Sequence, residues 1–526
     1  MKMNSYRHFL RTGAAFSLLL AGASLRADVT LAPLFQDNAV LQQGKPIPVW
    51  GKADAGEKVT VEFKGQKKES TAAADGRWAV SLDALPASAE GKEMVVTGKN
   101  TIRLNDILVG EVWICSGQSN MAFRVSLAKD AETEMAKATD GLIRQFKVEL
   151  KAADAPSDTA NGAWAACSPS TVKDFTAVGY FFARDIRRSL NVPVGLINTS
   201  YGGTPVESWM SEAALKSNPA FASTYERWKK ALEAYPAAQK VYDERFPKWL
   251  ADRNSARLAK AEFTAKPPRK PDGPGSRMTP SGLFNAMVYP LIPYAVRGVL
   301  WYQGEANASR SEEYRALFPA MISQWRKDFG QGELPFYFVQ LANLERKSDP
   351  SDSQWAFQRE AQACALQLPH TGMATAADVG DPINIHPKNK QEVGRRLALI
   401  ALALTYEKGG EYAGPVFKSA KAEGAAMQVA FTHAGGLKML DGAPGAFEVA
   451  GADKKFHPAT AKIEGDSLVV SAADVSSPVA VRYGWRNNPA LNLYNGADLP
   501  AFPFRSDDWP QPEQTRAARD TTPEAE

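Results

Sequence analysis

A serine directly after a long apolar run is the first residue whose type and setting suggest chemistry. The run Ile107–Ile114 is rich in branched residues, which favours a buried strand over a helix, and the polar cluster Ser116–Asn120 marks the turn after it. At the carboxyl end of a strand in an open α/β sheet, such a turn can expose a hydroxyl beside backbone N–H donors. Ser119 is therefore the candidate nucleophile, although Gly-x-Ser-Asn alone is also typical of a plain turn.

A serine hydroxyl needs a neighbouring base for acyl transfer, and that base is usually a histidine. His386 has a suitable position, because it lies in the loop 378–390, between an apparent strand and a strong helix. The remaining histidines after the N-terminal segment precede a strand or lie in a C-terminal β region, at His370, His433 and His457. Ser119 and His386 thus follow strands at the beginning and the end of one α/β unit, which predicts a Ser/His pair.

Two more glycine-bearing loops follow apolar strands and are expected at the same sheet edge, at 198–209 and 303–307. An oxyanion requires two or three donors fixed where negative charge develops. The candidate donors are the backbone N–H groups of Ser119 and Gly203 and a side-chain amide from Gln303 or Asn307. Gln118 and Glu305 are candidates for binding substrate, or in the case of Glu305 for pairing with a neighbour. Each amide also has a plainer interpretation, as an anchor of its own turn.

Around these loops, the pattern of strands predicts three regions in a chain of 526 residues, which is longer than one hydrophobic core usually supports. Alternating strands separated by Gly, Asp and Pro turns predict a β-sandwich-like module over 28–106. Apolar strands alternating with helices predict an α/β domain with a parallel sheet over 107–410. It is interrupted at about 225–278 by a charged helical and Pro-rich insertion, which is either a lid or partner surface or a solvated hairpin without a role. Strands without helices predict a second β module over 411–510, and 511–526 is expected to be disordered.

The elements expected to carry the site are strands and helices of the α/β region. The predicted strands are Ile107–Ile114, Val194–Asn198, Val296–Tyr302, Phe336–Leu341 and Met373–Ala376. The predicted helices are Val178–Leu190, Glu312–Phe329, Trp355–Gln367 and Lys390–Tyr406.

The N-terminus has the order of a secretory signal peptide, predicted over 1–27, with cleavage after Ala23 or Ala27. Its apolar run, Ala14–Ala23, is shorter than the ~20 residues that span a bilayer, and no later stretch qualifies. An exported protein without a membrane span, periplasmic or extracellular, is therefore expected.

Composition argues against several other classes of function. The formal charge of +4, from 62 basic and 58 acidic residues, gives no support for nucleic acid as a partner. Three cysteines form no disulfide framework, although one pair could form, and Cys115 is expected to be a small buried hydrophobe. Metal-ligand spacing of Cys and His is absent, and acyl transfer of this kind requires no metal or organic cofactor.

Four ordered blocks of sequence resemble the sialate O-acetylesterase family, a branch of the SGNH hydrolases. They are Gly110–Met121 (GEVWICSGQSNM), Tyr201–Trp209 (YGGTPVESW), Trp301–Asn307 (WYQGEAN) and Ile385–Leu397 (IHPKNKQEVGRRL). The resemblance extends to flanking β segments such as Leu34–Gln43 and Tyr483–Pro489. It implies an SGNH-type, flavodoxin-like three-layer αβα domain with a mainly parallel sheet between all-β modules. It also implies a serine esterase that acts on O-acetylated carbohydrate, sialic acid or other glycans, with attack by Ser119, base catalysis by His386 and an oxyanion hole from the other two loops.

The chain departs from the common SGNH pattern before its histidine. Such enzymes usually place an aspartate two or three residues before it, where this chain has Asn384 and Ile383. Asp381 is the tentative third member, Asp378 is an alternative, and a Ser/His dyad is also possible. The missing aspartate and the aromatic-rich C-terminal module also favour a rival function, that of a carbohydrate-binding protein with little or no catalysis. A secreted lipase or thioesterase would share the chemistry.

Overall fold

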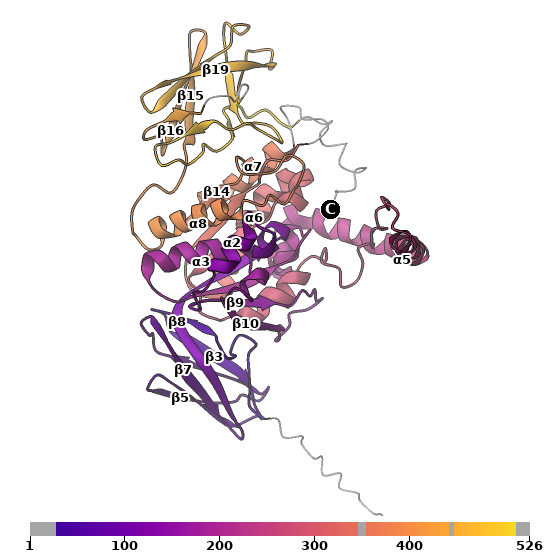
Figure 1. Ribbon diagram of the computed structural model, residues 1–526, viewed down its shortest axis with the longest axis vertical. Coiled ribbons are helices and arrows are strands. Elements are labelled where there is room, and N and C mark those ends of the chain that lie inside the picture. Colours follow the sequence, from indigo (N-terminus) through magenta and orange to yellow (C-terminus); the bar gives the residue numbers. More distant parts are fainter. Residues whose placement is uncertain (1–27, 346–353, 441–445, 512–526) are drawn as a thin grey trace, which may run out of the picture.

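The computed structural model describes residues 28–345, 354–440 and 446–511, and it stacks three tiers along its longest axis (Figure 1). N-terminal strands form the lowest tier, helices around a central sheet form the middle, and C-terminal strands form the top. The predicted signal peptide, 1–27, and the predicted tail beyond Gln511 lie outside the described residues. Within the described ranges, no helix combines the length and the apolar character that crossing a membrane requires.

The lowest tier is made of antiparallel strands whose side chains alternate between core and solvent. One sheet joins β1 (Thr30–Leu31), β3 (Ile47–Lys52) and β6 (Arg77–Leu82), and a second group joins β4 (Lys58–Phe63), β5 (Gln66–Thr71), β7 (Ser88–Thr97) and the first half of β8 (Thr101–Gly117). In β4 and β6 every second residue is buried, which is the period that the sequence analysis used. The polar β5 was not predicted, because none of its residues is buried.

The long strand β8 belongs to two tiers at once. Its residues 101–109 pair with β7, whereas 111–117 pair in parallel with β11 (Val194–Ser200) and 113–117 with β12 (Gly298–Tyr302). A short strand, β2 (Val40–Gln42), pairs with Leu108–Gly110 between the two halves. The predicted boundary between residues 106 and 107 therefore falls inside one continuous strand.

The central sheet runs β10-β9-β11-β8-β12-β13-β14, and all neighbours are parallel except β10 against β9. The remaining bounds are β9 (Ile143–Val148), β10 (Gly162–Ala166), β13 (Phe336–Gln340) and β14 (Thr371–Thr375). Strands β9 and β10 were not predicted from the sequence. Strand β9 was missed because it contains the polar residues Arg144 and Gln145, which are buried in the structure but read as exposed in the sequence.

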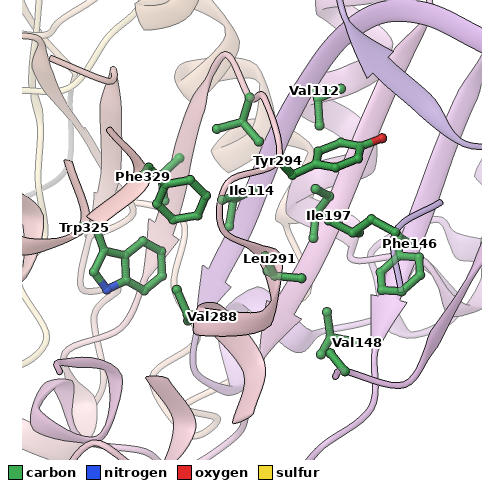
Figure 2. Close-up of a cluster of buried hydrophobic side chains, with 14 of the residues drawn as sticks. Val112, Ile114, Phe146, Val148, Ile197, Val288, Leu291, Tyr294, Trp325 and Phe329 are labelled. Atoms are coloured by element: carbon green, nitrogen blue, oxygen red, sulfur yellow. The ribbon is translucent and has the colours of Figure 1, made fainter. Parts of the chain in front are cut away.

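Both faces of this sheet are covered by helices. Val112 and Ile114 of β8 belong to one core, while Trp113 and Cys115 belong to the other, as the period of two requires. The first core includes α6 (Ser311–Phe329), and the second includes α3 (Ala177–Leu190) and α8 (Lys390–Leu404). Figure 2 shows the first core, where Val112, Ile114 and Ile197 from the strands meet Trp325 and Phe329 of α6.

The shorter helices of the α/β region lie in its loops. Their bounds are α1 (Ser119–Ala122), α2 (Ala131–Lys137), α4 (Glu212–Ser217) and α7 (Gln354–Ala363). The last of these continues as a 3₁₀ turn over Cys364–Gln367, so the predicted helix to Gln367 changes type at its end.

The predicted insertion contains one helix of 37 residues, α5 (Ala222–Leu258), which extends sideways from the middle tier (Figure 1). Thr224 is its single buried residue, and Pro236 and Pro247 lie inside it. The Pro/Gly-rich connector 266–275 that follows contains no helix or strand.

The upper tier is a seven-stranded sheet in the order β15-β16-β20-β19-β18-β21-β23, with a separate pair of β17 and β22. The bounds are β15 (Val416–Glu423), β16 (Ala426–Thr432), β17 (Lys438–Met439), β18 (Phe447–Ala450), β19 (Phe456–Glu464), β20 (Ser467–Ser471), β21 (Ala480–Tyr483), β22 (Leu493–Tyr494) and β23 (Phe504–Arg505). All strand neighbours in both sheets are antiparallel.

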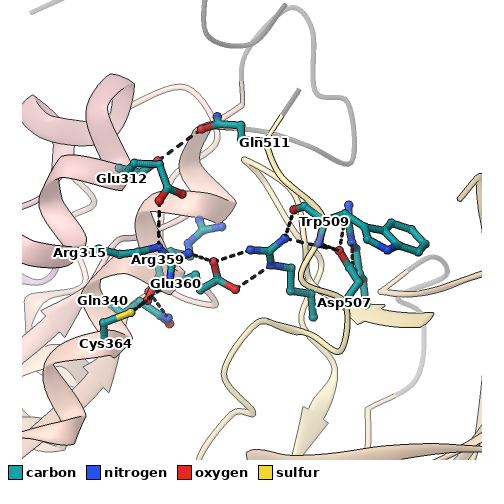
Figure 3. A network of polar contacts seen from close by, with 12 residues as sticks. Glu312, Arg315, Gln340, Arg359, Glu360, Cys364, Asp507, Trp509 and Gln511 are labelled. Atoms are coloured by element: carbon teal, nitrogen blue, oxygen red, sulfur yellow. Dashed lines mark hydrogen bonds and ion pairs between the residues drawn. The ribbon is translucent and has the colours of Figure 1, made fainter. Parts of the chain in front are cut away.

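Buried arginines join the upper tier to α7. The Arg359 guanidinium, fully buried, donates to the carbonyls of Leu341 and Ala342 on one side and of Arg486 and Asn487 on the other. Beside it, Glu360 accepts two hydrogen bonds from Arg505, and Glu360 also pairs with Arg315 of α6 (Figure 3). These contacts fix the upper tier against the α/β region.

Replacing Arg359 should loosen this junction. Arg359→Met keeps most of the side-chain volume but removes the guanidinium donor from four carbonyls. Those of Ala342 and Asn487 keep a second donor, from the Trp355 ring and the Leu344 N–H, whereas those of Leu341 and Arg486 lose the Arg359 bond. An unsatisfied buried polar group costs ~1–3 kcal/mol, so we expect the free energy of unfolding to fall by about 2 kcal/mol or more, seen as a lower urea midpoint. The control is Arg257→Met at an exposed position of α5, for which a change within ~0.5 kcal/mol is expected. Equal midpoints for the two variants would contradict the role given to Arg359.

Candidate active site

The turn after β8 exposes Ser119 at the edge of the central sheet. Gly117, the last residue of β8, has φ +126°, and a Cβ there would lie 2.2 Å from the carbonyl oxygen of Tyr302. Only glycine fits this approach of β8 to β12. Gln118 then donates its backbone N–H to the Tyr302 carbonyl at 2.9 Å, and Ser119 begins α1 half-buried. The first N–H groups of a helix have no intrahelical acceptor, so α1 itself does not use the Ser119 N–H.

The predicted Ser/His pair comes together in the structure. The Ser119 hydroxyl lies 2.7 Å from Nε2 of His386, in hydrogen-bond distance, although the two residues are 267 positions apart. His386 lies in the loop between β14 and α8, and its backbone N–H donates to the side-chain oxygen of Asn384 at 2.9 Å. Its ring stacks on Phe123, with ring centroids 6.5 Å apart. A nucleophile and a base in this contact can carry out acyl transfer.

The two carboxylates before His386 have different surroundings. The side chain of Asp378 is only 6% exposed, and both of its oxygens accept hydrogen bonds from Arg396 of α8, at 2.6 and 2.7 Å, while Tyr494 adds a third at 3.3 Å. Asp381 is half-buried and accepts a bond from the backbone N–H of Ile383 at 3.0 Å. Asp378 therefore anchors the loop to α8 and the upper tier, whereas the Asp381 contact stays within the loop, two residues along the chain.

The glycine loop after β11 packs directly on the nucleophile. A Cβ at Gly202 would lie 3.3 Å from Cβ of Ser119, so the backbone of this loop passes close to the serine. Gly203 follows with φ +65°, a conformation that glycine adopts without strain. Val206 of the same loop donates its N–H to the side-chain oxygen of Asn307 at 2.9 Å. The Gly203 N–H is thus carried by a loop that is fixed to a neighbouring segment.

The structure separates the two amides that were predicted as alternative oxyanion donors. The Gln303 amide nitrogen donates to the Thr204 carbonyl at 3.1 Å and to the Asn307 side-chain oxygen at 2.7 Å. Both of its hydrogens are therefore used inside the protein. The Asn307 amide nitrogen donates one hydrogen to Glu207 at 2.9 Å, which leaves its second hydrogen for another acceptor. This geometry favours Asn307 over Gln303 as a donor to substrate.

Gln118 and Glu305, the predicted substrate-binding residues, are almost completely buried. The side-chain oxygen of Gln118 faces the N–H groups of Gly304 and Ala306, at 3.4 and 3.3 Å. Glu305 accepts a hydrogen bond of 2.6 Å from the side chain of Asn120. Because these contacts join the serine turn to the 303–310 segment, the structure favours a supporting role over contact with substrate.

Cys115 and the other histidines lie away from this chemistry. Cys115 is buried, which raises the pKa of its thiol far above the ordinary value. Burial also raises the pKa of the Cys167 thiol, to about 12. His433 bonds Glu411 in the upper tier, and His370 lies in the turn before β14, at the opposite end of that strand from the His386 loop. Cys115 is thus the small buried residue that the sequence predicts.

Two residues near the serine were missed by the sequence analysis. Asn120 bonds Glu305 and the Ile385 carbonyl through its amide nitrogen and accepts from Lys390 through its oxygen. Lys390 is fully buried, and burial lowers the pKa of its ammonium to about 7, although the charge of Glu305 opposes that shift. The sequence offered only one signal for either residue, which is that both lie within the blocks around Ser119 and His386.

Known proteins with similar sequences share one activity in their names. Residues 109–241 and 282–403 match the profile of the family described as "Carbohydrate esterase, sialic acid-specific acetylesterase". The chain is 33% identical over 423 residues to sialate O-acetylesterase of Rattus norvegicus, covering 73% of this chain and 75% of the relative. It is 30% identical over 523 residues to sialate O-acetylesterase of Mus musculus, covering 89% and 92%.

A solved structure shares most of this architecture. The crystal structure of a novel carbohydrate acetylesterase from Xanthomonas citri superposes with a TM-score of 0.78 at 38% sequence identity. The match covers 92% of this chain and 100% of the other. It supports an α/β hydrolase-like fold with an additional β-rich C-terminal region. The matched family segments leave out residues 242–281, which contain the outer part of α5 and the connector.

Glu207, which accepts a hydrogen bond from the Asn307 amide, should make the free energy of unfolding depend on pH in the acid range. Burial raises the pKa of this carboxyl, but Arg310 at 2.8 Å and the bond from Asn307 outweigh that effect, so its pKa is lowered overall. A carboxylate with a lowered pKa stabilises the fold above its unfolded pKa, and that contribution is lost as the pH falls through the folded value. We expect Glu207→Gln to cost ~3 kcal/mol at pH 7, as for a broken buried ion pair.

The difference in free energy of unfolding between wild type and Glu207→Gln should therefore narrow below about pH 4, because protonation then removes the same charge from the wild type. Urea denaturation at pH 7, 5 and 3.5 measures it. Glu212→Gln is the matched control, since Glu212 is exposed and pairs with Lys216 on the surface, where ~0–1 kcal/mol is typical. A Glu207→Gln penalty that stays constant with pH would contradict the assigned ion pair.

Proposed function

The chain belongs to the family of sialic acid-specific acetylesterases and is a carboxylic ester hydrolase, and we propose that it removes O-acetyl groups from sialic acid or other acetylated glycans through an acetyl-enzyme at Ser119. The observation that carries this proposal is the 2.7 Å contact between the Ser119 hydroxyl and Nε2 of His386. A carbohydrate-binding protein without catalysis, the rival function, would not require that contact.

The proposed reaction has two steps that use the same base. His386 takes the proton of the Ser119 hydroxyl through Nε2 while the serine oxygen attacks the acetyl carbonyl. The tetrahedral intermediate collapses, the bond between the acetyl carbon and the sugar oxygen breaks, and the imidazolium gives its proton to the leaving sugar hydroxyl. Water, deprotonated by His386, then attacks the acetyl-enzyme, acetate leaves, and Ser119 regains its proton.

The developing oxyanion needs donors that are in place before the reaction. We assign this role to the backbone N–H groups of Ser119 and Gly203 and to the second amide hydrogen of Asn307. The support is their setting: Ser119 is the first residue of α1, a Cβ at Gly202 would lie 3.3 Å from Cβ of Ser119, and Asn307 holds Val206 of the same loop. Preorganised donors of this kind each contribute ~10²–10³ in rate.

The proposal includes the superfamily and the location of the protein. An SGNH-type domain over 107–410, with β modules over 28–106 and 411–510, is supported by parallel strand neighbours that carry Ser119 and His386 on loops at one edge. Export to the periplasm or the outside of the cell is supported by the signal-like order of residues 1–27. O-acetylated carbohydrate is the proposed substrate, in keeping with the names of the relatives.

Ser119→Ala should abolish hydrolysis of 4-nitrophenyl acetate and release of acetate from O-acetylated sialic acid. Loss of the nucleophile removes the covalent route, and in other serine hydrolases such a change costs ~10⁶ in kcat. A fluorophosphonate probe should label the wild type at Ser119 and leave the alanine variant unlabelled. Ser116→Ala is the control, because Ser116 is fully buried and bonds the Thr199 carbonyl. Equal activity of Ser119→Ala and wild type would end the proposal.

Asp381→Asn tests the third member of the site. If the carboxylate stabilises the imidazolium of His386, kcat should fall by ~10²–10⁴ with little change in KM. Asp378→Asn serves for comparison: it weakens the buried pair with Arg396, so it should lower the melting temperature more than Asp381→Asn does, and kcat less. Wild-type kcat in Asp381→Asn would assign the reaction to a Ser/His dyad.

A further inference from the structure

A second hydrogen bond runs beside the contact of Ser119 with His386, one residue away in each loop. The side-chain nitrogen of Asn120, next to Ser119, donates to the carbonyl of Ile385, next to His386, at 3.0 Å. The nucleophile and the base are therefore not held only by their own contact. Their chain neighbours are joined as well, which restrains the distance between the two loops.

The Asn120 side chain has one orientation that satisfies all of its partners. Its nitrogen faces two acceptors, the Ile385 carbonyl and the Glu305 carboxylate, the latter at 2.6 Å. Its oxygen faces Nζ of Lys390 at 2.5 Å, and an ammonium can only donate. Turning the amide over would oppose acceptor to acceptor and donor to donor, so all three partners favour the same orientation, and Lys390 is the one that fixes the oxygen.

Lys390 occupies a position that is unfavourable for a cation in two respects. It is fully buried, with its Nζ near the rings of Phe123 and Tyr302, at 4.8 and 5.3 Å from their centroids. It is also the first residue of α8, where the positive end of the helix dipole disfavours a cation. The ring faces and Glu305 offset part of this cost. A lysine in such a place is a candidate for a functional role, because an apolar residue would fill the same space without that cost.

We propose that Asn120 and Lys390 are positioning residues for Ser119 and His386. The ammonium of Lys390 holds the Asn120 amide in the orientation that bonds both Glu305 and Ile385. That amide in turn keeps Ser119 and His386 within reacting distance. In its ammonium form, which is populated below its lowered pKa of about 7, Lys390 also balances the Glu305 carboxylate across Asn120. This inference rests on the proposed esterase function of Ser119 and His386. Neither residue touches the ester; both act through the geometry of the pair.

Three variants test the proposal by kinetics on 4-nitrophenyl acetate. Lys390→Met keeps the length of the side chain without its charge, and Asn120→Asp keeps the shape of the amide but replaces the donor nitrogen. We expect each to lower kcat about 100-fold, as for a small misplacement of reacting groups, with KM changed less than threefold. The double variant Lys390→Met/Glu305→Gln removes both buried charges, so it should recover at least tenfold in kcat over Lys390→Met alone.

Lys388→Met is the matched control, because Lys388 is exposed in the same segment, and it should retain the kcat of the wild type. Melting temperatures show whether a variant folds, and the double variant is decisive if Lys390→Met is unstable. The proposal is overturned if Lys390→Met keeps the wild-type kcat, or if the double variant has a kcat no higher than that of Lys390→Met. If the wild type does not hydrolyse the ester and Ser119→Ala behaves in the same way, the proposed function is overturned instead.

Discussion

The site depends on the register of three parallel strands. Gly117 of β8 lies level with Ser200 of β11 on one side and with Tyr302 of β12 on the other, so the three strands end together. Parallel pairing with this alignment delivers the serine turn, the glycine loop and the 303–310 segment to one edge. A shift by one residue would turn the buried side chains of each strand to the other face and separate the loops, so the packing of the core and the geometry of the site require the same register.

Buried charges then fix the loops that the register delivers. Three buried charged groups near the site join different segments of the chain: Glu207 with Arg310, Asp378 with Arg396, and Lys390 with Glu305 through Asn120. Breaking such a contact leaves a desolvated group without its partner, which costs more than an exposed ion pair contributes. The loops are thereby held by specific polar contacts as well as by apolar packing, which suits a site that must keep donors and a base in fixed positions.

Much of this arrangement follows from local patterns in the sequence. Strand β13 and the pair of Ser119 with His386 were predicted, because an apolar run and a position after a strand are properties of short segments. The hydrogen bond that the Gln303 amide donates inside the protein was not predictable, since its acceptor is the Thr204 carbonyl about a hundred residues away. Lys390 reads as an ordinary first residue of a helix, and its burial arises only where Phe123 and Tyr302 fold over it. Strand β9 was missed because its buried polar residues imitate an exposed segment.

Because β8 belongs to two sheets, its two halves find their partner strands at different times during synthesis of the chain. Residues 101–109 find their antiparallel partner β7 immediately upstream, so the lowest tier can form early in synthesis. The apolar half, 111–117, must wait for β11, which begins at residue 194, and for β12, which begins at residue 298. During translation a nascent chain would thus present a hydrophobic strand edge for the time needed to make almost two hundred residues, the kind of surface that chaperones bind and that promotes aggregation. The strand that carries the nucleophile is, by the same connectivity, the segment most in need of protection before the protein is complete.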